Sequence, residues 1–186
     1  MPRSIEFILS AILACIALPA GLAIAAWVRL DSPGDSIHWS SRIGRHGRPF
    51  SMPKFRTMRV GTPQVATDRL SDPGIFVTRA GRWLRRTSLD ELPQLWSVLR
   101  GDMALVGPRP ALYTQEDLIA ARKALGIDSL RPGVTGWAQV NGRDEVSEQR
   151  KVELDQEYLA RRSFVFDLRI VAMTVLRVLR SDGIAH

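Results

Sequence analysis

The feature that most limits how this chain can fold is a stretch of 22 uncharged residues between Glu6 and Arg29. A helix needs about 20 apolar residues to cross the hydrocarbon core of a bilayer. A cleaved signal sequence is the alternative, but its apolar core is usually only about 7 to 15 residues long. The sequence therefore predicts a membrane segment over residues 1–30 and a separate domain over residues 31–186.

The middle of this stretch contains Pro19 and Gly21. Proline removes a backbone hydrogen bond and bends or breaks a helix. Basic residues, which prefer the cytoplasmic side of a membrane, stand on both sides of the stretch: Arg3 before it, and Arg29, Arg42, Arg45 and Arg48 after it. We therefore predict a re-entrant helix-break-helix at Pro19, with both ends on the cytoplasmic face, in preference to a spanning helix.

Composition limits the class of partner. The chain has 186 residues, with 26 basic and 19 acidic side chains and a net charge of +7, which favours nucleic acid, an acidic membrane surface or a phosphorylated substrate. Nucleic acid is disfavoured because only 7% of the residues are aromatic and could stack on bases. The single cysteine, Cys15, excludes a disulfide framework and suits a reducing, cytoplasmic setting. With three histidines in the whole chain, a zinc site is improbable.

Hydrophobic spacing predicts an α+β domain that is mostly helical with a small β-hairpin. The hairpin covers residues 37–58 and turns near Gly44 and Gly47. We expect a loop at residues 61–72, a short strand at 75–77, and helical segments at 81–86, 114–125 and 147–161. In the last of these, Asp155 and Tyr158 are expected to support the glycine-rich block at residues 131–143.

Apolar residues recur at helical spacing from residue 164 to the end of the chain, with arginines on the opposite face. The apolar positions are Phe164, Leu168, Val171, Val175 and Leu179, and the arginines are Arg169, Arg177 and Arg180. A helix packed on the core would show this pattern. An amphipathic helix lying on anionic headgroups fits it equally well, and the interfacial helix is the prediction carried forward.

The central segment places two adjacent carboxylates among arginines, in the order Arg85-Arg86-Thr87-Ser88-Leu89-Asp90-Glu91-Leu92-Pro93-Gln94. One explanation is structural, because Ser88 and Glu91 have the spacing of a capping box. Pro93 fits that helix poorly, and a helix capped by Asp90 would suit it better. The other explanation is catalytic: a carboxylate beside guanidinium groups is suited to attack phosphorus, because the cations stabilise the transferring phosphoryl group.

Other motifs extend this pattern. Lys54-Phe55-Arg56-Thr57-Met58 precedes the central segment, and Gly101-Asp102-Met103, Gly107-Pro108-Arg109-Pro110 and Arg131-Pro132-Gly133-Val134-Thr135-Gly136-Trp137-Ala138-Gln139-Val140-Asn141-Gly142-Arg143 follow it. In order and spacing, essentially the whole chain resembles the bacterial sugar transferases, the small monotopic phosphoglycosyl transferases. It departs from them where Leu18-Pro19 replaces the usual Ser-Pro and Trp39-Ser40 replaces a common Arg-Gln. Asp102 is interpreted as a turn residue.

The resemblance implies covalent catalysis in two displacements. Asp90 would attack the sugar-bearing phosphorus of a UDP-sugar and release UMP, and polyprenyl (undecaprenyl) phosphate would then accept the phosphosugar. This is the first membrane step of surface polysaccharide synthesis. Glu91 would hold Mg²⁺. Lys54, Arg85 and Arg109 match positions associated with phosphate contact, and Gln139 and Arg143 are candidates for binding the nucleotide or the diphosphate.

Resemblance also narrows the donor and the setting. Thr62-Pro63-Gln64-Val65-Ala66-Thr67, Pro110-Ala111-Leu112-Tyr113 and Gly142-Arg143-Asp144 are similar to capsule-initiating members. These members imply a UDP-N-acetylamino-6-deoxyhexose of the QuiNAc or FucNAc kind. The expected location is the cytoplasmic face of the bacterial inner membrane, in contact with lipids, with no nucleic acid as partner and with a homodimer allowed. A membrane-bound, Mg²⁺-dependent phosphohydrolase of nucleotide-sugar or prenyl phosphates is the alternative function.

Overall fold

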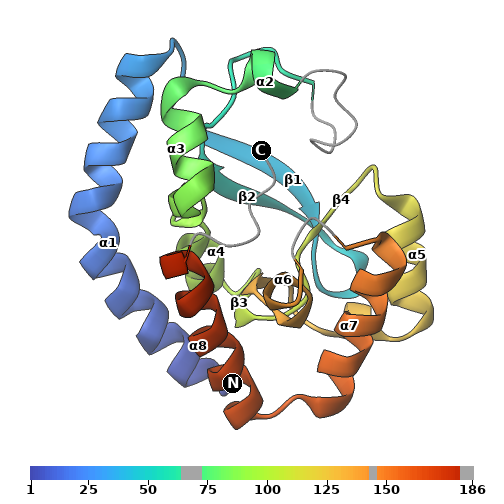
Figure 1. The fold of residues 1–186 in the computed structure, drawn as a ribbon. Coiled ribbons are helices and arrows are strands. Elements are labelled where there is room, and N and C mark those ends of the chain that lie inside the picture. Colours follow the sequence, from blue (N-terminus) through green and yellow to red (C-terminus); the bar gives the residue numbers. More distant parts are fainter. Residues whose placement is uncertain (64–72, 143–145, 181–186) are drawn as a thin grey trace.

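The computed structural model of the chain describes residues 1–63, 73–142 and 146–180 and shows a mainly helical α+β fold, as predicted (Figure 1). The helices are α1 (Arg3–Asp31), α2 (Pro73–Phe76), α3 (Arg79–Thr87), α4 (Gln94–Arg100), α5 (Glu116–Ala124), α6 (Trp137–Val140), α7 (Glu148–Arg161) and α8 (Phe164–Arg180). The strands are β1 (Ile37–Ile43), β2 (Pro49–Phe55), β3 (Ala104–Val106), β4 (Ala111–Leu112) and β5 (Gly133–Thr135). The described 3₁₀ turns are η1 (Arg45–Gly47), η3 (Leu89–Glu91) and η4 (Ile127–Ser129).

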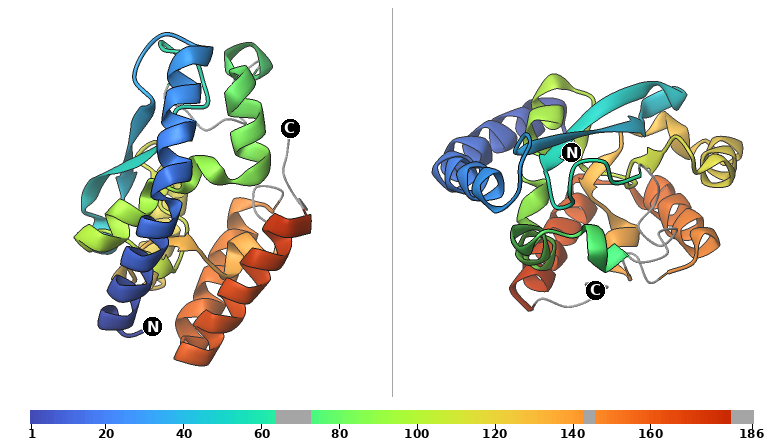
Figure 2. Two further views of the ribbon diagram at one scale, coloured as in Figure 1. Left: turned by 90° about the vertical axis from the view of Figure 1, so that its left-hand side faces the viewer. Right: turned by 90° about the horizontal axis from the view of Figure 1, so that it is seen from above.

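The β1–β2 hairpin lies along one side of the molecule, and α8 lies on the opposite side (Figure 2). Helix α1 runs along one edge, and α5 and α7 lie at the opposite edge. The start of α8 meets the start of the chain, where the amino group of Met1 pairs with the carboxylate of Asp167. The two long apolar helices, α1 and α8, are therefore joined at one end.

The predicted hairpin is confirmed. Strands β1 and β2 pair antiparallel over their full length, from Ile37 opposite Phe55 to Ile43 opposite Pro49. The turn η1 closes them, and Gly44 N donates to Arg48 O at 2.8 Å. Strand β4 adds to the other side of β1, so that the short segment after residue 110 is anchored to the hairpin.

A second, parallel pair of strands joins the two glycine-rich motifs. Strand β3 pairs with β5, and the contact continues past the strand ends because Gly133 N donates to Pro108 O at 2.8 Å. A Cβ atom on Gly107 would lie 2.4 Å from Arg131 O, so only glycine lets the backbones approach this closely. This contact sets the direction in which the chain leaves β3 toward residue 109.

Two clusters of buried apolar side chains form the core. The larger lies among α4 to α8 and the β3–β5 pair, with Val98, Met103, Ile127 and Ile170 almost fully buried. The smaller joins the second half of α1 to β2 and α3 through Val28, Phe55 and Leu84. Helix α1 is therefore part of the packed domain as well as an apolar segment.

Helix α1 continues unbroken through Pro19, so the structure does not contain the predicted helix-break-helix. Proline removes one hydrogen bond, but packing on both sides of it compensates. Ala14 packs against the larger core, and Ile24 and Val28 belong to the smaller one. The rule that proline breaks a helix considers only the lost backbone hydrogen bond, and it does not include these tertiary contacts.

The outward faces of α1 and α8 are apolar and exposed. On α1 the exposed residues include Phe7, Ile8, Ile12, Ile16, Leu18 and Leu22, and on α8 they include Phe164, Val165, Leu168, Val175 and Leu176. Helix α1 is long and apolar enough to cross a membrane. The predicted stripe of α8 is thus turned outward at Phe164, Leu168 and Val175, while Phe166 and Ile170 pack inward. The expectation that these three side chains pack on the core is therefore wrong. The alternative, that the helix lies on the membrane surface, stays a prediction.

Of the other predicted elements, three helical segments are confirmed and one strand is wrong. The helices expected at 114–125 and 147–161 are confirmed as α5 and α7, and α3 contains the predicted turn at 81–86. The strand expected at 75–77 is wrong, because α2 occupies Pro73–Phe76 and only Val77 forms a single bridge, to Met58. Most of the expected loop, residues 64–72, lies outside the described part of the chain.

Candidate active site

The two adjacent carboxylates lie in η3, a short turn between two helices. Helix α3 is capped by Thr78, whose side chain accepts a hydrogen bond from Gly81 N, and ends at Ser88 with φ of 56°. Helix α4 begins only at Gln94, after Pro93. The predicted capping box is therefore wrong, because Ser88 ends one helix and does not cap another with its side chain. The alternative helix start at Asp90 is also wrong, because Asp90 lies inside η3 and α4 begins at Gln94.

Asp90 is a buried carboxylate, with 8% of its surface exposed. Burial raises the pKa of Asp90 to about 6, and the negative charge of Glu91 adds to the increase. The positive charges of Lys54, Arg109 and Arg85 oppose it. The side chain is therefore mostly ionised at neutral pH, yet poorly solvated, which suits a nucleophile.

Lys54 enters the site from β2. Burial lowers the pKa of Lys54 to about 8, and the charge of Arg42 contributes further. Arg56 is two residues from Lys54 and would face the same side of a continuing strand, but β2 ends at Phe55. Arg56 instead turns away and donates hydrogen bonds to Asp35 O at 2.6 Å and Ser32 O at 2.8 Å, where it closes the loop after α1.

Arg42 is a site residue that sequence analysis did not identify. It lies on β1 two positions from Ser40 and four from His38, which pairs with Lys54, so that alternation places these side chains on one face. Burial lowers the pKa of Arg42 to about 10, Arg109 lowers it further, and Glu91 opposes this. The alternation along the predicted hairpin was the available signal, but without the fold it could not show that this face meets Asp90 and Glu91.

Glu91 and Arg109 form the direct ion pair of the site. Arg109 Nη2 lies 2.8 Å from Glu91 Oε1. Arg109 comes from the loop between β3 and β4, and Arg42 Nη1 donates to the next carbonyl oxygen, Pro110 O, at 3.2 Å. Arg85 comes from the last turn of α3 and its Nε donates to Thr57 Oγ1 at 3.1 Å.

The family follows from comparison with known proteins, because the family model described as bacterial sugar transferase matches residues 1–181. The chain belongs to this family. It is 43% identical over 159 residues to the uncharacterized sugar transferase EpsL of Bacillus subtilis, an alignment that covers 86% of this chain and 77% of that protein. The resemblance predicted from the motifs is confirmed, and the chain is a sugar transferase by family.

Two other relatives carry more specific names. The UDP-glucose:undecaprenyl-phosphate glucose-1-phosphate transferase of Xanthomonas campestris is 42% identical over 180 residues, 90% of this chain and 37% of that protein. The protein of the same name from Caulobacter vibrioides is 39% identical over 190 residues, 97% of this chain and 70% of that protein. The chain therefore spans well under half of the first and about two thirds of the second.

Within this bacterial sugar transferase, Gln139 lies on the short helix α6, beside the backbone of Gly107 and Gly136. It is 9% exposed, and among the described residues neither its Oε1 nor its Nε2 has a hydrogen-bond partner. A buried amide in this state normally pairs with an ordered water or a ligand. Arg143, the neighbouring candidate, lies outside the described residues.

Asp102 has the expected structural role. It follows Gly101, which ends α4 with φ of 95°, and its backbone N donates to Ser97 O at 3.0 Å. Its carboxylate lies 3.4 Å from Arg100 Nε. These contacts hold the turn that leads the chain from α4 into β3.

The donor set at the site suits magnesium held partly by substrate. No group of three or more His, Cys, Asp or Glu side chains that could hold a metal occurs among the described residues. Asp90 and Glu91 nevertheless offer adjacent carboxylates, and Mg²⁺ is usually bound by one or two carboxylates together with waters and substrate phosphates. The residues therefore fit a Mg²⁺–diphosphate better than a metal bound by protein alone.

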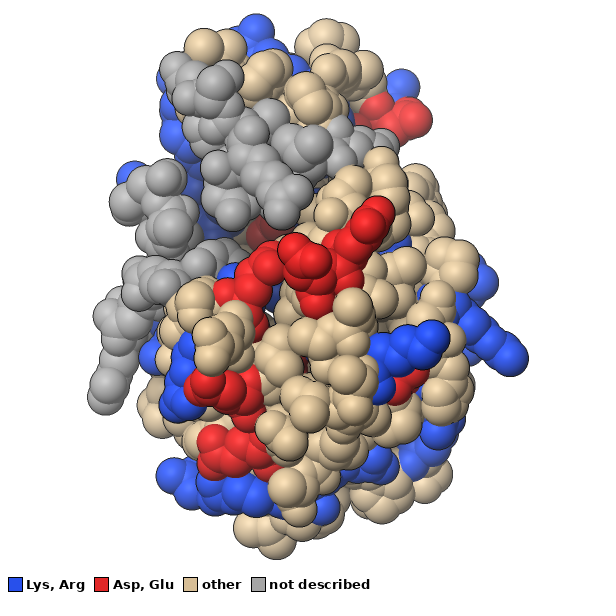
Figure 3. Space-filling view, turned by 90° about the vertical axis from the view of Figure 1, so that its right-hand side faces the viewer, with Lys and Arg blue, Asp and Glu red and all other residues tan. Residues whose placement is uncertain are grey.

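The face formed by α5 and α7 carries exposed acidic side chains (Figure 3). Figure 3, which views this side, shows acidic side chains running as an interrupted band across the face, with lysines and arginines mainly at its margins. Exposed acidic residues of these helices include Glu116, Asp117, Glu148 and Glu153. This face lies opposite the exposed apolar side of α1 (Figure 1). The net positive charge is therefore unevenly distributed, and the α5–α7 face is poorly suited to an anionic membrane.

Proposed function

We propose that this bacterial sugar transferase moves a phosphosugar from a UDP-sugar to undecaprenyl phosphate and releases UMP. The observation that supports this most directly is the buried carboxylate of Asp90, placed among the charges of Lys54, Arg85 and Arg109. The substrates are suggested by relatives named as undecaprenyl-phosphate sugar phosphotransferases. These names do not favour the phosphohydrolase considered as the alternative.

In the first displacement, a carboxylate oxygen of Asp90 attacks the sugar-bearing phosphorus of the donor. A phosphorus–oxygen bond forms, the bond to the bridging oxygen breaks, and UMP leaves with the electron pair. Lys54, Arg85 and Arg109 bind the diphosphate and stabilise the negative charge that develops on the transferring group. Gln139 and Arg143 are assigned to the nucleotide or diphosphate.

Mg²⁺, when bound, neutralises charge on the diphosphate and the leaving UMP, and Glu91 is the protein residue assigned to hold it. The ion pair with Arg109 keeps the Glu91 side chain directed toward the phosphate-binding cations. In the second displacement, an oxygen of undecaprenyl phosphate attacks the same phosphorus and Asp90 leaves as a free carboxylate. The product is undecaprenyl-diphospho-sugar.

The test is incubation of the detergent-solubilised protein with a UDP-sugar panel, with and without undecaprenyl phosphate. Without acceptor, we expect UMP in an amount close to that of the enzyme, together with a phosphosugar adduct on the peptide containing Asp90 by mass spectrometry. With acceptor, we expect turnover. Continuous release of inorganic phosphate or free sugar phosphate into water would instead identify a hydrolase.

The packing of α1 supports attachment to one face of the membrane. At its start, the guanidinium of Arg3 donates to the carbonyl oxygens of Val98 and Leu99 on α4. At its end, Asp31 Oδ2 accepts a hydrogen bond from Ala80 N on α3 at 2.9 Å. The unbroken helix is about 43 Å long, so the distance between its ends does not by itself exclude a spanning helix. The distinguishing observation is that both ends contact the same domain, which a bilayer between them would prevent. We therefore retain the prediction that both ends are cytoplasmic, without a break at Pro19.

In this arrangement the exposed apolar faces of α1 and α8 enter one leaflet. Trp27 on α1 and Trp83 on α3 are partly exposed, with ring centroids 5.5 Å apart, and Trp96 on α4 is also exposed. Tryptophan favours the boundary between headgroups and hydrocarbon. These rings would mark the depth to which the domain enters the inner membrane.

Single cysteines test the topology. In a Cys15→Ala background, Ser4→Cys and Asp35→Cys place thiols on exposed positions at the two ends of α1. We expect a membrane-impermeant maleimide to label neither in intact spheroplasts and both after the membrane is opened. Labelling of one of the two in intact spheroplasts would identify a spanning helix.

For the donor, we propose a UDP-N-acetylamino-6-deoxyhexose, on the basis of the motifs similar to capsule-initiating members. A site that binds an acetamido group leaves buried polar groups unpaired when a hydroxyl replaces it, which can reduce kcat/KM by orders of magnitude. Seven relatives are named for glucose or galactose, so these donors are the necessary comparison. Comparable UMP release from UDP-glucose and from the N-acetylated donors would overturn the donor assignment and leave the transfer reaction intact.

A further inference from the structure

Helix α7 lies outside the active site, yet two of its polar residues bind the side chains that hold the loop carrying Arg109. Glu148, Asp155 and Tyr158 are spaced seven and three residues apart, which places them on one face of the helix. This face is turned toward residues 106–112. Asp155 and Tyr158 were expected to support the second glycine-rich block. In the structure Asp155 instead binds Arg122 of α5, and Tyr158 contacts the end of β3 and Asp167 of α8.

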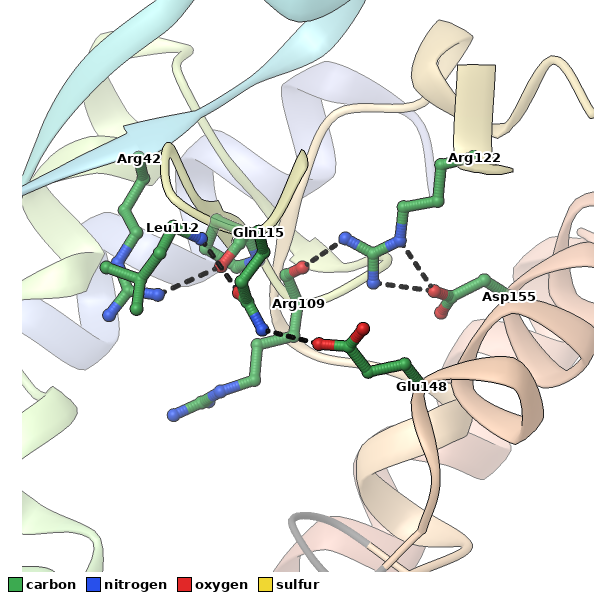
Figure 4. Close-up of polar contacts among 8 residues, drawn as sticks. Arg42, Arg109, Leu112, Gln115, Arg122, Glu148 and Asp155 are labelled. Atoms are coloured by element: carbon green, nitrogen blue, oxygen red, sulfur yellow. Dashed lines mark hydrogen bonds and ion pairs between the residues drawn. The ribbon is translucent and has the colours of Figure 1, made fainter. Parts of the chain in front are cut away.

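The strongest of these contacts passes through Arg122 of α5. Its Nε and Nη2 donate to Asp155 Oδ2 at 3.0 and 2.6 Å, and its Nη1 donates to Arg109 O at 2.8 Å (Figure 4). The Arg122 side chain is 11% exposed and that of Asp155 is 1% exposed. A guanidinium held by two bonds to a buried carboxylate has little freedom to turn. Its third contact therefore fixes the position of the Arg109 backbone.

Two weaker contacts hold the same loop on either side of Arg109. Leu112 N donates to Gln115 Oε1 at 3.0 Å, and Gln115 Nε2 donates to Glu148 Oε1 at 3.2 Å. Tyr158 Oη lies 3.2 Å from Val106 O and 2.7 Å from Asp167 Oδ1, and its single proton serves one acceptor at a time. Arg122 thus makes the central contact.

Two arginines hold the backbone of the loop at Arg109 (Figure 4). Arg42 and Arg122 approach the loop from opposite sides and bind the consecutive carbonyl oxygens of Pro110 and Arg109. Proline on each side of Arg109 limits rotation of the backbone. The remaining freedom lies in the Arg109 side chain, whose Nη2 reaches Glu91 Oε1 at 2.8 Å. A shift of the backbone would pull this guanidinium away from Glu91.

We propose that Arg122, locked by Asp155, is a positioning residue for phosphosugar transfer, because it holds Arg109 against Glu91 and among the cations that bind the diphosphate. It acts through Arg109 and does not itself touch the substrate. The inference rests on the proposed function and adds a residue to it that lies on a different helix. A purely structural Arg122 would stabilise α5 against α7 without affecting the chemistry of Arg109.

The test is a comparison of Arg122 variants in two backgrounds. Arg122→Gln/Asp155→Asn replaces the ion pair by neutral groups and leaves no unpaired buried charge. Arg122→Lys keeps a charge for Asp155 but has no planar fork to bind Arg109 O at the same time. Lys123→Gln, on the exposed neighbouring position, is the matched control. Each is measured for UMP release in wild-type protein and in an Arg109→Gln background.

In the wild-type background, both Arg122 variants are expected to lower kcat by about 10- to 100-fold, the scale of a misplaced catalytic contact. In the Arg109→Gln background they are expected to lower it by less than about threefold, because the residue through which they act is already gone. The acid limb of the pH profile should move upward in the Arg122 variants, as in Arg109→Gln, because Arg109 lowers the pKa of Asp90. Equal losses in both backgrounds, or no loss in either, would overturn the proposal.

A second measurement separates this inference from the proposed function. Amide hydrogen exchange across residues 106–112 should become faster in Arg122→Gln/Asp155→Asn and stay unchanged in Lys123→Gln. Unchanged exchange in the double variant shows that Arg122 does not hold the loop and overturns the proposal. If wild-type protein releases UMP from no donor, the proposed function fails, and the exchange result still decides whether Arg122 fixes the Arg109 loop.

Discussion

Asp90 and Asp155 are both buried aspartates, but their surroundings differ. Burial raises the pKa of each carboxyl group, against the effect of nearby cations. Asp155 receives two hydrogen bonds from the guanidinium of Arg122. Asp90 has an acidic neighbour, Glu91, and is influenced by several cations from β2, α3 and the loop after β3.

The difference separates a structural charge from a reactive one. Asp155 and Arg122 satisfy each other with defined geometry, so little of either charge is left for a ligand. The cations around Asp90 come from separate elements and can also bind phosphate oxygens. Their charges stabilise the Asp90 carboxylate in the free protein and would stabilise the diphosphate in the complex. The four predictions that follow test this contrast, beginning with the largest effect.

Asp90→Asn should abolish transfer, with a fall in kcat of more than about 10³-fold, because the nucleophilic oxygen is replaced by an amide of the same size. The measurement is UMP release with undecaprenyl phosphate and the best donor. Glu116→Gln, an exposed position on α5, serves as control. Retention of wild-type turnover by Asp90→Asn would exclude the covalent mechanism.

Glu91→Gln should lower kcat by about 10²-fold and raise the Mg²⁺ concentration needed for half-maximal rate, because one carboxylate for the metal is lost. The glutamine can still accept a hydrogen bond from Arg109, so the loop contact is partly kept. Rates are measured as a function of Mg²⁺ concentration. An unchanged Mg²⁺ optimum with full activity would leave Glu91 with the Arg109 contact as its only role.

The same type of substitution should change stability in opposite directions at the two aspartates. The folded-state pKa of Asp90, about 6, is above its ordinary value of 3.8, so ionisation of Asp90 costs stability as pH rises through about 4 to 6. At neutral pH, Asp90→Asn should therefore stabilise the protein by about 1 to 3 kcal/mol.

Burial raises the pKa of Asp155 as well, so linkage alone would give the same sign, but here the direct ion pair with Arg122 decides. Asp155→Asn should destabilise the protein by about 3 to 5 kcal/mol, because it leaves the charge of Arg122 buried without a counter-ion. Thermal unfolding of both variants in the same detergent shows whether each substitution raises or lowers stability. A loss of stability in Asp90→Asn, or a gain in Asp155→Asn, would contradict the division into a reactive and a structural carboxylate.

The sequence predicted most of the elements, because amphipathic spacing and turn residues act locally. The hairpin, α3, α5, α7 and the family motifs around Asp90 were all accessible in this way. What it could not predict were interactions between distant segments. Continuation of α1 through Pro19 depends on packing against two cores, and the role of Arg56 depends on where β2 ends.

The residues missed around the site share one property: their function depends on a partner far away in the chain. In the sequence, Arg122 is one of many basic residues and lies on the predicted helix at 114–125. Only the structure shows that it contacts Asp155, 33 residues away in the chain, and the carbonyl oxygen of Arg109. Arg42 was part of a basic flank used to argue membrane orientation. Charge and spacing cannot distinguish a solvated arginine from one buried in a site, because burial is a property of the fold.

The smallest predicted effect is on the pH dependence of kcat/KM. We expect a bell-shaped profile, with an acid limb near pH 6 as Asp90 becomes ionised and a basic limb near pH 8 as Lys54 loses its proton. The sign of each shift follows from the charges. Removing the negative charge of Glu91 should lower the pKa of Asp90 and move the acid limb to lower pH, whereas Arg109→Gln should raise that pKa and move the limb upward.

Single-turnover measurements with enzyme in excess make these slow variants accessible, and Glu116→Gln controls for a change in net charge far from the site. Each unit of displacement of the limb corresponds to about 1.4 kcal/mol of altered interaction with the Asp90 charge, so even a shift of half a unit is informative. Opposite displacements in Glu91→Gln and Arg109→Gln are required if the limb reports Asp90. Displacements of the same sign, or a limb that Glu116→Gln moves equally, would mean that another group controls the reaction, and Asp90 would then be no more reactive than Asp155.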